Sequence, residues 1–548
     1  MHAGAYERAT GWARAARHWP LWLGGTVLVT SVAASAGAIV TLTGGRFVYA
    51  LDDAYIHMAM ARNLAHYGVW GCTPFRFASA SSSPLWTATL GAAYFVTGVH
   101  ELTPLVLNVL FGVLTLAAAD ATLRRRGATP LLRATALIGL VLAVPLPAMA
   151  LLGMEHVLHL LLTIAFAVAV VGVLSAAPPP DSAPPAGTTA LCVLAALLTA
   201  SRYEGLFLVA LACLAFVALG QWRRGLLVGL SAAAPLAVLG LVSVGHGSYL
   251  LPNSLMIKTG REGASIWSLL LRPFDPADVA FLQRDHPLLW VLAAGATAAL
   301  IAGVRARAMR DARVLMPLGL ALMTALHVHF APSSAYWVYR YDAYLIGVGV
   351  LVAAVLLSRV ATSLPARWQT TSGVLAVAAM AAWTATLGHM REGLYPRVEI
   401  ESASLTYREH YEAAQFVHDR RPGETVIVND VGAMAFVSGA DVLDLFGLCS
   451  VEPVTLRLAG PYDKVDVEAW TLPYQPSLAV VQLSWGWVVG RLPDDWLKVA
   501  EVELLPEGRR VGFFATTHDV AAAHKLRQDL ERFYRPLEGA LAYRLRVF

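Results

Sequence analysis

The chain has 548 residues, of which 57% are hydrophobic and only 14% are charged, with a formal net charge of +4. Because a soluble domain carries about 25% charged residues, this composition excludes an ordinary soluble globular protein and indicates a helical membrane protein. The basic excess lies in short loops and no nucleic-acid-binding motif accompanies it, so it indicates membrane topology and not a nucleic-acid partner.

Apolar runs recur along the first 390 residues, each close to the roughly 20 residues that a helix needs to cross a bilayer. Eleven runs are crossing candidates: 21–43, 104–123, 131–152, 156–175, 188–200, 205–219, 225–244, 288–304, 314–331, 337–357 and 371–389. A shorter run, 84–99, begins at Pro84. Either this run is re-entrant, or it crosses and one of the short runs 188–200 and 205–219 does not. We therefore predict about 11 to 12 transmembrane helices.

Basic residues in the loops predict the sidedness of the chain by the positive-inside rule. A basic leader precedes the first run, which lacks a small-residue cleavage site and is interpreted as a membrane anchor and not as a signal peptide. The basic loops predicted to be cytoplasmic contain Arg124, Arg125, Arg126 and Arg133; Arg223 and Arg224; Arg305, Arg307, Arg310 and Arg313; and Arg359 and Arg367. The N-terminus is then cytoplasmic and the C-terminal region is outside.

The character of the sequence changes after about residue 395. The Pro-rich stretch 177–187 has the composition of a cytoplasmic linker. Beyond 395, short β-type segments appear: TVIV (425–428), VLDLF (442–446) and LAVVQL (478–483). We predict a transmembrane domain over 1–394, with a first external loop at 44–83, and an extracytoplasmic α/β domain over 395–548.

Polar residues at the membrane edge are costly and usually functional. In the predicted topology, five segments reach the same external face. They contain Asp52 and Asp53, Glu155 and His156, Arg202 and Glu204, Asn253 and Lys258, and Arg340 and Asp342. Any one of them could be a charge snorkelling at a helix end, but five on one side predict an active site built from loops.

The adjacent carboxylates Asp52 and Asp53 begin a predicted short interfacial helix, on which Tyr55, Met58 and Arg62 share one face. Repulsion between the carboxylates would suit one of them to accept a proton. Capping of that helix is an equal alternative, since Asp is a favoured N-cap residue.

Two cations, Lys258 and Arg340, suit a phosphate group, although contact with lipid head groups is an alternative. The four cysteines show no metal-type spacing. Cys72 and Cys449 both fall outside the cytoplasm in the predicted topology, which leaves open whether they form a disulfide.

Six motifs in order resemble those of GT-C glycosyltransferases. The similarity is to mycobacterial terminal arabinofuranosyltransferases and to bacterial proteins of the dolichyl-phosphate-mannose mannosyltransferase type. The motifs are DDAYI with ARNLA and SSSPLW, GMEHVL, SRYEG, LLPNSLMIK, YRYDAYL and NDVGAMAFVSGADVLDLFGL. Two departures, CTPFRFASA after Gly71 and Tyr203 in place of Pro, affect the sugar or acceptor more than the reaction class.

The resemblance implies a GT-C-like fold and inverting transfer of a sugar, with arabinose as one candidate pentofuranose. The donor would be a polyprenyl-phosphate sugar, and the acceptor a hydroxyl of a glycan, lipid or protein outside the inner (cytoplasmic) membrane. Asp52 would be the general base, and Asp53 its supporter or a ligand of a divalent cation (Mg, Mn or Ca). Lys258, Arg340 and Arg202 would bind the donor phosphate. The remaining expected substrate-binding residues are Tyr55, His57, Arg62, Glu155, His156, Glu204, Asn253 and Asp342.

Two other functions compete with this prediction. In a transporter or flippase, the same charges would line a path through the helices. In a catalytically silent scaffold, the paired Asp residues and the cations would be dispensable. The sequence leaves open the sugar, the acceptor, the prenyl length and the oligomeric state.

Overall fold

The computed structural model describes residues 2–175, 187–259, 295–297, 300–301, 312–330, 339–516, 519–539 and 542–548. Several predicted features fall outside these residues. They are almost all of the linker 177–187, most of the crossing run 288–304, the basic loop 305–310 and the start of the run 337–357.

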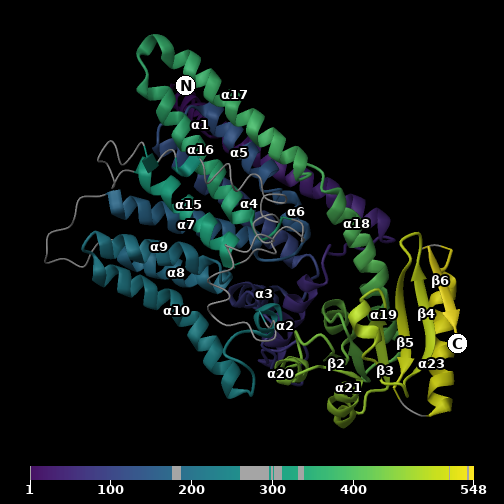
Figure 1. Cartoon of the computed structure of the whole chain (residues 1–548). Helices are drawn as coiled ribbons and strands as arrows, with labels where there is room; N and C mark the ends of the chain where they lie inside the picture. The colour runs from purple at the N-terminus through teal and green to yellow at the C-terminus, as the bar shows by residue number, and fades with distance from the viewer. Residues whose placement is uncertain are drawn as a thin grey trace. The chain divides into compact units, whose positions relative to one another are not determined.

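The chain forms two compact units, each assembled from three segments of the sequence (Figure 1). The first unit contains Met1–Ala38, Pro104–Leu236 and Ser265–Glu399, and the second contains Ile39–Thr103, Ala237–Ala264 and Ile400–Phe548. The division of the sequence at 394/395 into a membrane domain and an external domain stays a prediction.

The first unit is a bundle of apolar helices. Its helices are α1 (His2–Leu42), α4 (Thr103–Arg125), α5 (Pro130–Ala143), α6 (Leu146–Leu151), α7 (His156–Ser175), α8 (Thr188–Ser201), α9 (Gly205–Ala218), α10 (Trp222–Gly245), α15 (Ala312–Phe330), α16 (Ala343–Ser363) and α17 (Ala366–Met390). Within the described residues, six helices are long and apolar enough to cross a membrane: α4, α7, α10, α16, α17 and residues His18–Leu42 of α1. The chain is therefore a multi-pass membrane protein, while the number of crossings stays a prediction.

Two predicted runs differ from single crossing helices. The run 131–152 divides into α5 and α6 around Pro145, because proline lacks the N–H that a continuous helix requires and its ring clashes with the preceding turn. The run 84–99 forms α3 (Pro84–Thr97), whose 14 residues span only about 21 Å, less than the roughly 30 Å hydrocarbon core. Helix α3 packs against α2 (Asp53–Tyr67) in the second unit.

The second unit contains a six-stranded mixed sheet with the order β2-β1-β3-β5-β4-β6. Its strands are β1 (Thr425–Val428), β2 (Asp441–Asp444), β3 (Leu478–Gln482), β4 (Leu497–Leu504), β5 (Arg509–Ala515) and β6 (Tyr543–Val547). Strand β1 is parallel to both β2 and β3, whereas β5, β4 and β6 continue the sheet with antiparallel pairs. The three predicted strands are confirmed as β1, β2 and β3, and the α/β fold of the C-terminal region is confirmed with them.

The second unit also contains short helices. In addition to α2 and α3 they are α11 (Asn253–Thr259), α18 (Arg397–Thr406), α19 (Glu412–Arg420), α20 (Glu452–Ala459), α21 (Lys464–Thr471), α22 (Gly486–Val489) and α23 (Val520–Tyr534), with π-helical turns at Tyr407–Tyr411 and Met434–Ser438. One core cluster joins strand residues such as Ile427, Leu443 and Val481 to Trp470 and Trp496. Because β2, β1 and β3 are parallel, the loops that follow them leave the same edge of the sheet.

Candidate active site

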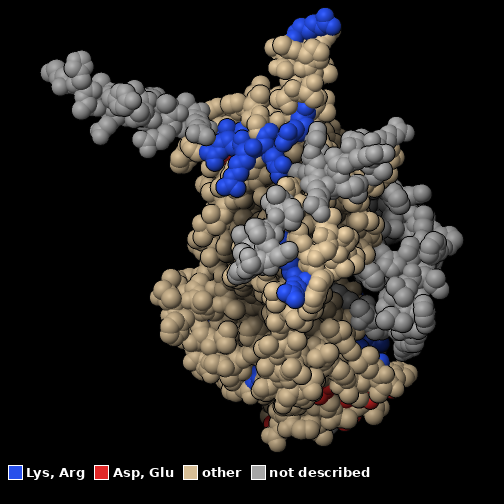
Figure 2. Space-filling model, turned by 90° about the vertical axis from the view of Figure 1, so that its left-hand side faces the viewer, with Lys and Arg blue, Asp and Glu red and all other residues tan. Residues whose placement is uncertain are grey.

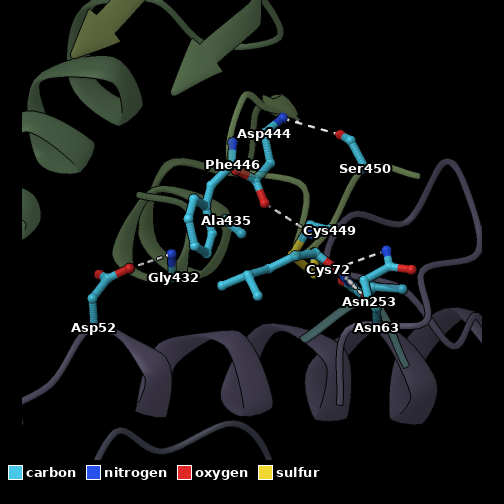
Figure 3. The surroundings of a disulfide bond; sticks show 12 residues. Asp52, Asn63, Cys72, Asn253, Gly432, Ala435, Asp444, Phe446, Cys449 and Ser450 are labelled. Atoms are coloured by element: carbon cyan, nitrogen blue, oxygen red, sulfur yellow. Dashed lines mark hydrogen bonds between the residues drawn. A yellow bond between two sulfur atoms is a disulfide. The ribbon is translucent and has the colours of Figure 1, made fainter. Parts of the chain in front are cut away.

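The Asp52 carboxylate binds the start of the helical segment that follows β1 (Figure 3). Its Oδ2 accepts a hydrogen bond from the Gly432 N–H at 2.5 Å, and its Oδ1 accepts one from the Ala433 N–H at 2.7 Å. The first N–H groups of a helix have no partner within the helix, and Asp52 satisfies two of them. Asp52 makes no side-chain capping bond to its own helix α2, so capping of α2 by this side chain is wrong. The carboxylate caps a segment 380 residues further along the chain.

Glycine at 432 permits this close approach. A Cβ built on Gly432 would lie 2.0 Å from the Asp52 carbonyl oxygen and 2.6 Å from Oδ2. No side chain can be accommodated at that distance without moving backbone, so Gly432 belongs to the site as much as Asp52 does.

Arg62 holds the same segment about one turn further on. Its Nη2 donates to the Ala435 carbonyl at 3.1 Å and its Nη1 donates to the Phe436 carbonyl at 2.6 Å. The guanidinium also lies 5.6 Å from the centre of the Phe436 ring. Helix α2 thus binds the segment at two points, through Asp52 and Arg62. In this structure the donors of Arg62 bind backbone carbonyls. Its predicted role in binding substrate stays a prediction.

Asp430 is a second acid beside Asp52. It directly precedes the segment that Asp52 caps, its side chain is 15% exposed, and His410 Nε2 lies 3.6 Å from its Oδ2. Burial raises the pKa of Asp430 well above the usual carboxyl range, and the neighbouring Asp52 carboxylate raises it further. Asp53 contributes to the same rise in pKa. Asp430 therefore retains its proton to higher pH than an ordinary Asp, next to Asp52.

Sequence reasoning did not select Asp430 as a site residue. The signal was present, because Asp430 lies in the NDVG motif, two residues after a strand. Carboxyl ends of parallel strands are where open α/β sheets bind ligands.

The loop after β2 is held by Asp444 and by a disulfide (Figure 3). The Asp444 carboxylate accepts backbone hydrogen bonds from Phe446 at 2.8 Å and Cys449 at 2.9 Å. Cys449 is bonded to Cys72, with their Cα atoms 6.0 Å apart, which answers the question that the sequence left open. The disulfide joins the loop that follows α2 to the loop that follows β2.

Asn253 binds the same loop. Its Nδ2 donates to the Leu448 carbonyl at 3.1 Å, and its backbone N–H donates to the Ser79 carbonyl at 2.8 Å. Lys258 lies on the same helix, α11, but its side chain is outside the described part of the chain. The phosphate-binding role of Lys258 stays a prediction.

Tyr55 and His57 are buried within the second unit. The Tyr55 hydroxyl accepts a hydrogen bond from the Tyr49 N–H at 3.2 Å, and His57 Nδ1 lies 2.8 Å from the Thr87 hydroxyl. These contacts connect α2 to its neighbours. The predicted substrate contacts of both side chains stay predictions.

Asp53 is the first residue of α2 and is half-buried. Across the described ranges, no group of three or more His, Cys, Asp or Glu residues is arranged to hold a metal ion. The divalent cation at Asp53 stays a prediction, and we derive no chemical step through one.

In the first unit, Arg202 lies between two carboxylates. Its Nη1 donates to Glu155 Oε1 at 2.5 Å, its Nη2 to Glu204 Oε1 at 2.6 Å and its Nε to Glu204 Oε2 at 3.2 Å. Arg202 and Glu155 are buried. The two carboxylates more than neutralise the guanidinium, so its charge already has partners before any phosphate arrives.

Tyr341 connects this group to the segment 340–342. The guanidinium carbons of Arg202 and Arg340 lie 5.0 Å and 4.9 Å from the centre of the Tyr341 ring, and the His156 ring contacts it edge-on at 5.9 Å. Arg340 Nη2 donates to the Tyr341 hydroxyl at 3.1 Å. Three of the predicted polar segments thus meet within the first unit.

The carboxylate of Asp342 is bound by an arginine that the sequence reasoning missed. Arg391, just after α17, donates to Asp342 Oδ1 at 2.7 Å and to Oδ2 at 3.0 Å. A bidentate arginine–carboxylate pair of this kind fixes geometry strongly. Its only sequence signal was a basic residue directly after the last apolar run.

Comparison with known proteins places this geometry in a known fold. A sequence search of curated proteins finds no significant match. A family model described as a domain of unknown function (DUF8728) matches residues 399–521. The apo structure of ArnT from Cupriavidus metallidurans is similar over 93% of this chain and 98% of its own, at 15% identity and a TM-score of 0.50. The apo oligosaccharyltransferase of Archaeoglobus fulgidus is similar over 95% of this chain and 78% of its own, at 10% identity and a TM-score of 0.51. This chain has the GT-C glycosyltransferase fold.

The GT-C fold confirms the predicted fold class, with membrane helices and a sheet-containing C-terminal region. ArnT has also been solved bound to undecaprenyl phosphate; that structure aligns with 90% of this chain and 98% of its own, at 15% identity and a TM-score of 0.49. At such identities the likeness establishes the fold alone.

Proposed function

We propose that this GT-C protein transfers a sugar from a polyprenyl-phosphate donor to an acceptor hydroxyl on the non-cytoplasmic face of the inner membrane, with inversion. The observation that carries the proposal is the acid pair of Asp52 and Asp430 at the carboxyl edge of the parallel strands. A transporter or a silent scaffold does not need a second acid beside a carboxylate whose orientation is fixed by backbone N–H groups.

Asp52 is the proposed general base. Two backbone N–H groups fix the orientation of its carboxylate, which offers about four lone-pair sites and so has acceptor capacity left for a substrate hydroxyl. Burial, and then the neighbouring Asp52 carboxylate, raise the pKa of Asp430, which favours the protonated form of this acid beside the base. We propose that Asp53 at the start of α2 supports this arrangement.

The donor phosphate needs a cationic ligand. A phosphate leaving group needs stabilisation of negative charge and no protonating acid. We propose Arg340 as the group that provides it, because an arginine can bind two phosphate oxygens at once. Arg202, already paired with Glu155 and Glu204, is proposed to position Tyr341 and through it Arg340. Lys258 is retained as a second proposed phosphate ligand.

One observation supports the non-cytoplasmic placement of the second unit, and another supports the cytoplasmic placement of one end of the helices in the first unit. Disulfides such as Cys72–Cys449 persist in oxidising compartments and are rare in the cytosol. In the face shown in Figure 2, Lys and Arg side chains gather near one end of the helical unit, beside a broad uncharged surface. Such an asymmetry is typical of the cytoplasmic end of membrane helices.

The test is a transfer assay with purified protein and a panel of synthetic polyprenyl-phosphate sugars that includes arabinofuranose. At least one donor should be turned over, and Arg340→Gln should lower turnover by about 10²-fold or more, as removal of a charge-stabilising group does. Arg202→Gln should in addition lower thermal stability, because it leaves the buried Glu155 carboxylate and the half-buried Glu204 carboxylate without their cation. The same assay with and without EDTA tests the predicted divalent cation. No turnover of any donor, or full activity in Arg340→Gln, would contradict the proposal.

A further inference from the structure

Six side chains form a surface cluster on the second unit that the proposed chemistry does not use. We call it the aromatic–arginine platform, and its members are Phe446, Arg457, Tyr462, Trp485, Trp487 and Arg491. Tyr462 is buried, while Phe446, Trp485 and Trp487 are half-buried. Both Trp residues pack on one side against the core of the sheet, so each keeps part of its surface accessible.

The two arginines of the platform share the same aromatic rings. The Arg457 guanidinium lies 4.9 Å from the centre of the Trp487 ring and 5.3 Å from that of Tyr462. The Arg491 guanidinium lies 5.4 Å and 5.7 Å from the same two centres. Phe446 is also in range of Arg457, at 5.3 Å. Two cations are thereby held close together.

Neither cation is matched by an acid within the described part of the chain. No ion pair there involves Arg457 or Arg491, and Arg457 Nε is buried without a hydrogen-bond partner. Asp444, the nearby acid, already accepts hydrogen bonds from Phe446 and Cys449. Burial, and then repulsion from Arg491, oppose the charge of Arg457 and lower its pKa, although Tyr462 and Asp444 act in the opposite direction. An anion bound between the two guanidiniums would relieve this cost.

The platform lies at the same sheet edge as the acid pair. Phe446 follows β2, and Trp485 and Trp487 follow β3, while Asp430 follows β1 between them in the sheet. Ligands of open α/β sheets bind at the carboxyl ends of parallel strands, where the order 2-1-3 has its switch point next to β1. The Phe446 N–H bond to Asp444 and the Arg457 bond to the Leu445 carbonyl tie the platform to the loop that the disulfide holds.

We propose that the platform binds the acceptor, and that the acceptor is an oligosaccharide carrying an acidic group. The half-exposed rings fit the apolar faces of sugar rings, and the two guanidiniums fit a carboxylate or phosphate on the same molecule. That the ligand is the acceptor rests on the proposed function, whereas the binding of an acidic oligosaccharide does not.

A purely structural role for the platform predicts a different outcome. Cation–π contacts stabilise a fold even when no ligand is bound. If the platform only stabilised the fold, replacing either arginine would lower the unfolding temperature, and the wild-type protein would bind no ligand there. An anionic membrane surface is the other occupant that aromatic and basic side chains could bind.

The binding test uses the full-length protein in detergent micelles and isothermal titration calorimetry with tetragalacturonate as the acidic probe and maltotetraose as the neutral one. Tetragalacturonate should bind and maltotetraose should bind at least about tenfold more weakly. Arg457→Gln and Arg491→Gln should each weaken tetragalacturonate binding about tenfold or more, the size expected for a lost charged hydrogen bond. The matched control is Arg532→Gln, an exposed arginine of α23 outside the platform, which should bind as the wild type does.

Three results would overturn the inference. They are no tetragalacturonate binding by the wild-type protein, wild-type tetragalacturonate affinity in both platform variants, or binding of the protein only to phosphatidylglycerol vesicles. If Arg457→Gln does not fold, Arg491→Gln decides alone. Because the titration contains no donor, its outcome is separate from that of the transfer assay. If the protein transfers a sugar but does not bind tetragalacturonate, only the platform inference is rejected. If it binds tetragalacturonate but transfers a sugar from none of the donors, only the enzymatic proposal is rejected.

Discussion

At the scale of single residues, Asp52 combines a structural contact with the proposed base. Asp52→Asn keeps one acceptor oxygen but turns N–H donors toward the Gly432 or Ala433 N–H. We expect transfer to fall by roughly 10²-fold to 10⁴-fold, the range for loss of a general base, and stability to fall by about 1–3 kcal/mol for a buried donor left without its acceptor. Turnover and thermal unfolding measure the two effects. Asp53→Asn is the control and should be milder in both, and wild-type turnover in the double Asn variant would contradict the mechanism.

The sequence singled out Asp52 and Arg62 as candidate site residues but did not predict their partners. Asp52 and Arg62 stood out because carboxylates and guanidiniums are rare beside a membrane helix. Their partners are backbone groups of residues 432–436, which have no sequence signature because every residue carries the same N–H and carbonyl. Asp342 shows the same limit, since its partner Arg391 lies 49 residues away and differs in no local feature from other basic residues.

Asp430 provides a prediction about pH. Its pKa is raised in the folded state, so the protonated form is favoured by folding, and the stability it contributes is present below the usual carboxyl range and is lost as pH rises through the raised value. Asp430→Asn imitates the protonated acid at every pH. The unfolding temperature of this variant should therefore equal that of the wild type at low pH and exceed it increasingly toward neutral pH. Thermal scans from pH 4 to 8 measure this, with the exposed Asp494→Asn as a control whose difference from wild type should not grow with pH. A constant difference for Asp430→Asn would contradict the raised pKa.

At the scale of elements, helices and strands with a regular hydrophobic pattern were predicted well, whereas irregular backbone such as a π-helical turn was not. The run 156–175 coincides with α7 and TVIV coincides with β1, because length and composition alone determine such segments. The π-helical turn Met434–Ser438 was not predicted, since the contacts that hold it come from α2. The antiparallel strands β4, β5 and β6 were also missed. The alternation of β5 is weakened because the adjacent Arg509 and Arg510 place charge on both of its faces.

The close approach of α2 to the segment after β1 depends on Gly432. In Gly432→Ala the new Cβ would overlap the Asp52 carbonyl oxygen, so backbone must move and the caps at Gly432 and Ala433 should weaken. We expect a loss of about 1–3 kcal/mol in unfolding free energy, as for an overpacked site, together with reduced transfer. Gly490→Ala is the matched control, because its backbone is right-handed helical and its Cβ would meet nothing within 4 Å. Equal unfolding temperatures for the two variants would show that α2 and the segment do not approach as described.

At the scale of the whole molecule, the second unit is assembled from three segments that are distant in sequence. The first external loop, residues 237–264 and the C-terminal region share one unit through long-range contacts such as Cys72–Cys449 and Asn253–Leu448. Hydrophobic periodicity depends only on residues that are close in sequence. It located the polar segments, but it could not predict which of them belong to the same unit. The prediction of which runs cross the membrane was limited in the same way by short apolar helices such as α5, α8 and α9, whose composition resembles that of full crossings.

The sidedness of the basic loop after α4 and of the second unit can be tested directly. In a variant with Cys192 and Cys213 replaced by alanine, the remaining cysteines are joined in a disulfide, so a single added thiol reports one position. Ala521→Cys lies exposed on α23 of the second unit, and Arg125→Cys lies exposed at the basic end of α4. Because the basic loop is predicted to be cytoplasmic and the disulfide-bonded unit external, a membrane-impermeant maleimide should label Ala521→Cys in spheroplasts and should label Arg125→Cys only after permeabilisation. A permeant maleimide, which should label both, controls for thiol reactivity. Labelling of Arg125→Cys but not Ala521→Cys in sealed spheroplasts would place the second unit in the cytoplasm, and a polyprenyl-linked donor on the outer face could then not be its substrate.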